Sequence, residues 1–153
     1  MDISREMVER ASRNLSALRF DGRVEFRQGD ARRLPFEDDA VDFVVSTLSL
    51  HHWSDPKQAL LEIHRVLPPQ GQFLLFDLRR DGQRWFYWLL RFACTFVVPA
   101  PIRRVNEPLG SALASYTPAE MEALLSGTPY LRWNIRPGSV WMFIWGAKGH
   151  YPA

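Results

Sequence analysis

The chain has 153 residues, of which 46% are hydrophobic and 13% aromatic. This is enough for one domain with a buried core and too little to favour a second domain. The formal net charge is only +2, a surplus too small to point to a nucleic-acid partner.

Cysteine content and hydropathy indicate the compartment. Cys94 is the only cysteine and lies in an apolar run, so an intrachain disulfide is excluded and a buried thiol is expected. No basic region precedes an apolar stretch near the N-terminus, which argues against a signal peptide. The longest apolar segment, 85–98, is too short to span a bilayer and contains Arg91. We therefore expect a cytoplasmic protein.

The first half of the chain alternates helical and strand patterns. Ser4 can cap a helix that ends near 20–22, and 23–30 predicts a short strand. Residues 40–48 form a β-branched run typical of a strand covered on both faces. A helix over 54–67 begins with Pro56 in its first turn, and 71–78 predicts a further strand. This order predicts an α/β fold with parallel neighbouring strands.

The second half has a different character. Residues 83–98 predict an aromatic helix, and a loop follows to Tyr116. Thr117 and Glu120 form a capping box at the start of a helix over 117–127. The final segments, 130–136 and 140–148, flank a Pro-Gly-Ser turn and predict a terminal β-hairpin.

Chemistry-bearing residues follow each predicted strand. Asp30-Ala31 follows the first strand, 46–53 the second, and Asp77 lies at the end of the third, before Arg79 and Arg80. In open α/β sheets, ligands bind beyond the carboxyl ends of the strands. A carboxylate there can accept hydrogen bonds from hydroxyls or an exocyclic amine, and the next backbone N–H is a fixed donor. These are the parts of an adenosine pocket.

Three sequence blocks together resemble the class I S-adenosylmethionine-dependent methyltransferases, type 11 subgroup. They are DIS, VEFRQGDARRLPFEDDAVDFVVSTLSLHHW and ALLEIHRVLPPQGQFLLFDL, and they cover about 1–80, with a looser likeness over 117–147. The resemblance implies a truncated Rossmann-like sheet, mainly parallel, with a C-terminal antiparallel hairpin and helices on both faces. It also implies one partial domain: a cofactor-side core (1–80), an aromatic acceptor-side insertion (81–116), and a terminal helix and hairpin (117–153).

The resemblance also implies a binding site for S-adenosylmethionine, the methyl donor. Asp2, next to Ile3, would hold the ribose hydroxyls, and Asp30 the adenine amino group, with the Ala31 N–H facing the ring. Leu34 and Phe36 would wall the adenine, and 48–53, beginning at Leu48, would approach the methionine part. The alternative for Asp30 is a turn cap. Glu62 and Arg65 match the family too, but we expect them to position secondary structure.

His51 and His52 are candidate catalytic residues. Methyl transfer from a sulfonium mainly requires orientation and exclusion of water. A general base helps when the acceptor loses a proton, as a phenol or an activated carbon does. Either histidine could serve as that base; the alternative is that the pair lines the pocket or packs the loop.

The aromatic segment 85–98 has three interpretations. The favoured one is a helix that packs on the sheet or caps the acceptor site, which suits a small, apolar acceptor. The second is peripheral contact with a membrane surface or a lipid-like substrate, supported by flanking arginines. The third, a nucleic-acid platform, is disfavoured because the fourth family strand leads into LSLHHW instead of a Pro-Pro-aromatic motif.

One element of the family pattern is not found: no two of the nine glycines form a GxGxG loop. Such loops bring backbone N–H groups to the donor. Without the first family strand, strand 23–28 must pair differently, remain an edge, or be completed by another chain or a second copy. The sequence therefore leaves two hypotheses open: a methyltransferase, or a non-catalytic remnant or binding module.

Overall fold

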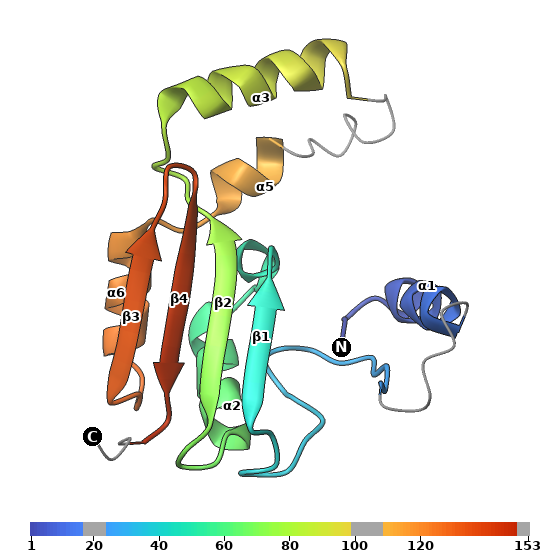
Figure 1. Cartoon of the computed structure of the whole chain (residues 1–153), viewed down its shortest axis with the longest axis vertical. Coiled ribbons are helices and arrows are strands. Elements are labelled where there is room, and N and C mark those ends of the chain that lie inside the picture. Colours follow the sequence, from blue (N-terminus) through green and yellow to red (C-terminus); the bar gives the residue numbers. More distant parts are fainter. Residues whose placement is uncertain (17–23, 99–108, 150–153) are drawn as a thin grey trace.

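The computed structural model describes residues 1–16, 24–98 and 109–149, which form a four-stranded sheet of order β1-β2-β4-β3 flanked by helices (Figure 1). The strands are β1 (Phe43–Thr47), β2 (Gln72–Leu78), β3 (Arg132–Pro137) and β4 (Trp141–Ala147). The helices are α1 (Arg5–Ser16), the 3-10 turn η1 (Leu50–His52), α2 (Pro56–Val66), α3 (Arg84–Phe96), α5 (Leu109–Ala114) and α6 (Pro118–Ser126).

The sheet is mixed. β1 and β2 pair in parallel, with Val45 opposite Leu74, and the connection between them contains α2. β4 runs antiparallel to both β2 and β3, so the predicted terminal hairpin is confirmed and adds to the sheet beside β2. This topology confirms the predicted α/β sheet with a C-terminal antiparallel hairpin. The described sheet is not mainly parallel as expected, since only one of its three strand pairs is parallel.

The core lies between one face of the sheet and the helices α2 and α6. Asp55 caps α2 by accepting the Gln58 N–H at 2.9 Å, and the predicted capping box of Thr117 and Glu120 starts α6. Alternation along β2 and β4 turns every second residue toward these helices. The buried cluster is made chiefly of Leu60, Ile63, Val66, Phe73, Leu75, Met121, Leu125, Met142 and Ile144.

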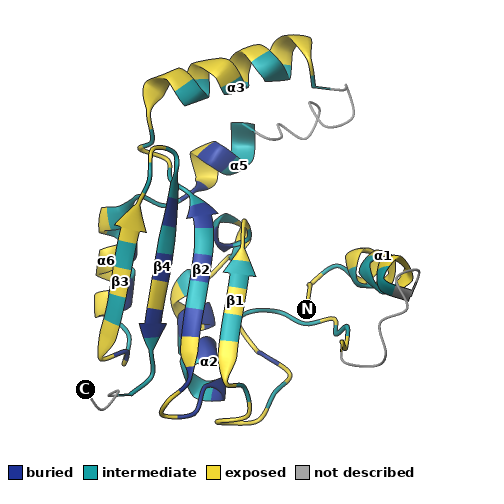
Figure 2. Ribbon diagram, in the orientation of Figure 1, coloured by how far each residue is buried: buried dark blue, intermediate teal, exposed yellow. Residues whose placement is uncertain are grey.

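The opposite face of the sheet is only partly buried (Figure 2). Phe76, Trp141 and Phe143 pack against one another there, with ring centroids 4.9 to 6.2 Å apart. Helices were predicted on both faces, whereas the two helices that share the buried cluster, α2 and α6, lie on the same face. Within the described residues, the expected helices are therefore found packed on one face of the sheet.

Two strand predictions need correction. Residues 24–30 form no strand ladder: only the bridges Asp2↔Gln28 and Asp30↔Arg33 form, and residue 23 lies outside the described part. β1 forms, but it is an edge strand with Phe43 and Val45 about half exposed, and it is not covered on both faces. Both results have one cause: a strand ladder needs a continuous neighbour, and in the described residues β1 pairs only with β2.

Helix α3 confirms the aromatic helix expected over 83–98, and it crosses the end of the sheet near α5 (Figure 1). Cys94 lies on it and is half-buried, not buried as expected, because α3 has no fully buried residue. The predicted end of the first helix, at 20–22, lies outside the described residues.

Gly146 in β4 is required by close packing. A Cβ atom there would lie 2.7 Å from the Arg132 carbonyl oxygen and 2.7 Å from the Phe73 ring. We therefore expect Gly146→Ala to lower the free energy of unfolding by about 1.5 kcal/mol, since overpacking must displace backbone. Urea denaturation measures this, with Gly127→Ala as control because the nearest atom to its Cβ would be 3.4 Å away. Equal stability of the two variants would contradict the prediction.

Candidate functional site

A cavity of about 600 Å³ lies beside the free edge of β1. This volume is within the usual range for small-molecule sites. Its walls come from the N-terminal segment, the loop 29–36, strand β1, the turn after β1, and α2; they include Asp2, Ile3, Asp30, Ala31, Leu34, Phe36, Ser46, His52 and Trp53. Most of the residues predicted to hold a donor thus meet at one cavity, whereas Leu48 and His51 do not line it.

Backbone hydrogen bonds bring Asp2 and Asp30 together, although 28 positions separate them. The Asp2 N–H donates to the Arg27 carbonyl at 3.2 Å, and the Gly29 N–H donates to the Asp2 carbonyl at 3.0 Å. The Gln28 side chain adds a bond to the Ile3 carbonyl at 3.1 Å. This short parallel bridge replaces a strand ladder as the link between the two carboxylates.

The Asp30 carboxylate is held by Arg32. It accepts the Arg32 backbone N–H at 2.9 Å and the guanidinium Nη2 at 2.7 Å. These hydrogen bonds hold the pKa of Asp30 below its ordinary value, so the group is an acceptor at neutral pH. The contacts match the turn-cap alternative, and the carboxylate also borders the cavity. A carboxylate can accept about four hydrogen bonds, so both roles are compatible.

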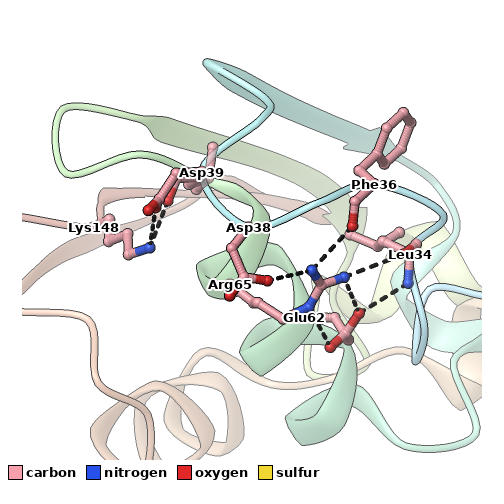
Figure 3. A network of polar contacts seen from close by, with 8 residues as sticks. Leu34, Phe36, Asp38, Asp39, Glu62, Arg65 and Lys148 are labelled. Atoms are coloured by element: carbon pink, nitrogen blue, oxygen red, sulfur yellow. Dashed lines mark hydrogen bonds and ion pairs between the residues drawn. The ribbon is translucent and has the colours of Figure 1, made fainter.

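Glu62 and Arg65 of α2 form hydrogen bonds to residues 34–38, a segment that we call the cavity loop (Figure 3). The Arg65 guanidinium binds the Glu62 carboxylate and donates to the carbonyls of Leu34 and Phe36 at 3.2 and 3.0 Å. It also contacts Asp38 at 2.7 Å, and Glu62 accepts the Leu34 N–H at 2.9 Å. Arg65 thereby holds the pKa of Glu62 below its ordinary value. These contacts agree with a positioning role for the pair.

The turn after β1 has an unusual backbone. Leu48 has φ of 52°, a left-handed conformation that leucine seldom adopts, and is half exposed. Its N–H still donates to the Phe76 carbonyl at 2.8 Å. The Ser46 and Ser49 hydroxyls are 2.5 Å apart. Strained backbone of this kind gathers at functional sites, and here it turns the chain into η1, which carries both histidines.

His51 forms a buried pair with Asp77 at the end of β2. Nδ1 of His51 lies 2.8 Å from Oδ1 of Asp77, and the two side chains are 3% and 1% exposed. Asp77 also accepts the backbone N–H groups of His51 at 3.2 Å and Leu78 at 2.7 Å. Because a carboxylate only accepts, Nδ1 of a neutral His51 carries the proton and Nε2 has the free lone pair.

The Nε2 atom of His51 belongs to a side chain that is only 3% exposed. It forms no hydrogen bond within the described residues, and in that part of the chain no buried side-chain nitrogen or oxygen lacks a partner. The His51 ring packs on His52, with centroids 4.1 Å apart, and His52 lines the cavity. The sequence placed Asp77 at a strand end but did not predict its pairing with His51, because 26 residues separate them.

Comparisons with known proteins identify the class. The solved structure of YcgJ from Bacillus subtilis is 29% identical with a TM-score of 0.64, covering 88% of this chain and 52% of that one. A SAM-dependent methyltransferase from Aquifex aeolicus has a TM-score of 0.63 at 19% identity, covering 94% and 64%. The sheet is thus the Rossmann-like sheet of these methyltransferases.

The sequence comparisons agree with the resemblance. Residues 1–75, just under half of the chain, match a family described as "Methyltransferase domain". An uncharacterized methyltransferase, YcgJ of Bacillus subtilis, is 42% identical over 77 residues, covering 50% of this chain and 30% of that protein. A demethylmenaquinone methyltransferase of Leptospira interrogans is 34% identical over 100 residues, covering 65% and 40%. Residues 1–75 are thus similar to the class I S-adenosylmethionine-dependent methyltransferases of the type 11 subgroup, the family that the sequence blocks resemble.

Two consequences follow for the site. The methyl donor of this family is S-adenosylmethionine. The cavity is lined by two acidic residues, Asp2 and Asp30, and by the apolar Leu34 and Phe36, which are residue types that an adenosine group would need. The chain spans less than half the length of the curated relatives just described, 30% and 40%. The activities of those longer proteins therefore support only a proposal about this chain.

Proposed function

We propose that this chain carries out S-adenosylmethionine-dependent methyl transfer to a small, apolar acceptor that loses a proton in the reaction. The observation that carries this proposal is the buried His51–Asp77 pair next to the His52 wall of the cavity. A buried structural histidine also needs a partner for its N–H, but a base needs in addition a fixed tautomer with a free lone pair, and the pair with Asp77 gives His51 both.

The roles of the side chains follow from their positions. When bound, the donor supplies an electrophilic methyl group. Asp2 and Asp30 hold the ribose hydroxyls and the adenine amino group, and Leu34 with Phe36 excludes water from the ring. Asp77 orients His51, and Nε2 of His51 accepts the proton of a phenol or an activated carbon. C- and O-methylation both use this base.

The acceptor class rests on two kinds of support. Two of the relatives are named demethylmenaquinone methyltransferases, so the acceptor in their names is demethylmenaquinone. In this chain, α3 adds aromatic side chains near the end of the sheet at which Asp77 lies (Figure 1). Together these support an apolar, aromatic or lipid-like acceptor.

A second candidate function is a binding module without catalysis. It is favoured by the absence of a GxGxG loop from the printed sequence and by the short bridge that alone links Asp2 to residue 28. Donor affinity separates the two candidates, because catalysis requires the donor to occupy the cavity.

We expect the 153-residue chain to bind S-adenosylmethionine more weakly than micromolar, since its sequence contains no glycine loop to bring backbone N–H groups to the donor. Titration calorimetry measures this affinity. Asp30→Asn should weaken binding about tenfold further by removing a charged acceptor, whereas Glu122→Gln, exposed on α6, serves as control and should not change it. Micromolar binding by the unaltered chain would contradict the expectation.

Transfer of a labelled methyl group to a panel of quinol, phenol and lipid-like acceptors tests the proposed activity at saturating donor. His51→Gln should abolish transfer without changing donor affinity, because His51 does not line the cavity. Transfer that survives in His51→Gln would exclude His51 as the base. Transfer to RNA alone would refute the small-molecule acceptor, and no transfer to any acceptor would favour the binding module.

A further inference from the structure

Helix α3 is exposed over much of its length (Figure 2), and its exposed residues include a row of large apolar side chains. The residues of this aromatic stripe are Trp85, Trp88, Leu89, Phe92 and Phe96, of which Trp88 and Phe96 are 71% and 73% exposed. At 100° per residue, the five positions fall within an arc of about 100°. The rings of Trp88 and Phe92 are stacked, and those of Phe92 and Phe96 lie 4.8 Å apart.

The rest of α3 is anchored, so the exposure of the stripe does not reflect a detached helix. Inner residues such as Phe86 and Leu90 are half-buried, and α5 packs beside α3. The Tyr87 hydroxyl donates to the Arg79 carbonyl, and the Gln83 N–H donates to Ser139 at 2.9 Å, which ties the start of α3 to the β3–β4 turn. Apolar surface of this size on a fixed helix marks an interaction site.

The charged residues of α3 are both arginines. Arg84 and Arg91 lie along one border of the stripe at helical spacing, and both are exposed. Helix α3 contains no aspartate or glutamate. An apolar, tryptophan-containing stripe bordered by guanidinium groups complements a surface that is apolar inside and anionic outside.

Other occupants fit this surface less well. In the described part of the chain, no helix is long and apolar enough to cross a membrane, and α3 has only 13 residues, about 20 Å. If two copies of the chain packed through their aromatic stripes, the arginines of the two α3 helices would lie close together. Their charges would repel, because α3 contains no acidic residue to pair with them. We propose that α3 docks the protein flat on the surface of an anionic lipid bilayer, with the aromatic stripe buried at the headgroup boundary.

Vesicle binding tests this proposal without any methyl donor or acceptor, so its outcome is independent of the proposed activity. Flotation with vesicles of phosphatidylcholine and phosphatidylglycerol at 7:3 should recover the protein, and pure phosphatidylcholine vesicles should recover much less. Trp88→Gln with Phe96→Gln should lower partitioning at least about tenfold. Arg84→Gln with Arg91→Gln should lower it about 25-fold on anionic vesicles, fivefold per arginine.

Controls keep the test specific to α3. Leu131→Gln removes an exposed leucine before β3, and Val45→Gln removes an exposed side chain from the open face of the sheet; both should bind vesicles like the unaltered chain. Lack of anionic-vesicle binding, equal binding to neutral vesicles, or an equal loss with Val45→Gln would overturn the proposal. A dimer in sedimentation that the Trp88 and Phe96 substitutions dissolve would show that the occupant is a second copy.

Discussion

Replacing Asp77 by alanine is expected to lower the free energy of unfolding by about 3 kcal/mol and to release the His51 ring. The Asp77 carboxylate is 1% exposed and accepts three hydrogen bonds, from the His51 ring, the His51 backbone and the Leu78 backbone. Alanine leaves these donors buried without acceptors, and each unsatisfied group costs about 1 kcal/mol or more.

Urea denaturation measures the stability, and nitrogen NMR of the imidazole reports the His51 tautomer. Asp77→Asn should cost only about 1 kcal/mol, because its carbonyl oxygen can still accept the Nδ1 proton. Glu37→Ala, at an exposed loop position, is the control for loss of a carboxylate. If the alanine variant kept both its stability and the Nδ1-protonated tautomer, the proposed role of Asp77 in orienting His51 would be wrong.

Arg65→Ala is expected to lower the free energy of unfolding by about 2 kcal/mol and to loosen the cavity loop. The guanidinium joins α2 to 34–38 through the carbonyls of Leu34 and Phe36 and the carboxylate of Asp38 (Figure 3). Its side chain is 31% exposed, so solvent screening reduces the effect below that of a fully buried pair. Arg65→Lys should recover less than half, because an ammonium group cannot reproduce the planar fork.

Thermal unfolding and hydrogen exchange of residues 34–38 measure the two parts of this expectation. Arg136→Ala, exposed on β3 and away from the loop, is the matched control. Unchanged exchange at residues 34–38 in Arg65→Ala would show that the loop is fixed by other contacts.

The Glu62–Arg65 ion pair makes the free energy of unfolding depend on pH. Arg65 lowers the pKa of Glu62 in the folded state, so the ionised carboxylate stabilises the fold at any pH above the unfolded value, about 4.3. This contribution is lost as the pH falls from about 4.3 through the lower folded pKa. Glu62→Gln should therefore reduce the difference between the free energies of unfolding at pH 6 and at pH 3. Urea denaturation at the two pH values measures this difference. An unchanged difference would show that the Glu62–Arg65 pair does not cause the pH dependence.

Much of the fold could be predicted from local sequence signals. The apolar spacing of α2, the capping box of α6 and the turn residues before β4 each specify their element through contacts a few residues apart. The strand ladder expected over 23–30 does not form, because contacts a few residues apart do not specify a ladder. Strand propensity there is real, but a ladder depends on a distant neighbour, and the described chain supplies only the bridge from Asp2.

The candidate site was also predicted only in part from the sequence. Asp2 and Asp30 were predicted from a recurrent family pattern, and the structure brings both to one cavity. Arg32 was missed as the partner of Asp30, although it is only two residues away, because an exposed arginine in a turn carries no distinctive pattern. Whether the donor contacts the predicted residues Asp2, Ile3, Asp30, Ala31 and Leu48 stays a prediction.

The sequence by itself determined the α/β class and the resemblance of residues 1–75 to a methyltransferase family, because periodicity, caps and short motifs are local properties of the chain. Only the tertiary structure decided which of two adjacent histidines is paired with a buried carboxylate, which faces the cavity, and which side of α3 is exposed. These depend on where β2 ends relative to η1 and on what packs beside α3, and such long-range packing leaves no fixed spacing in the sequence.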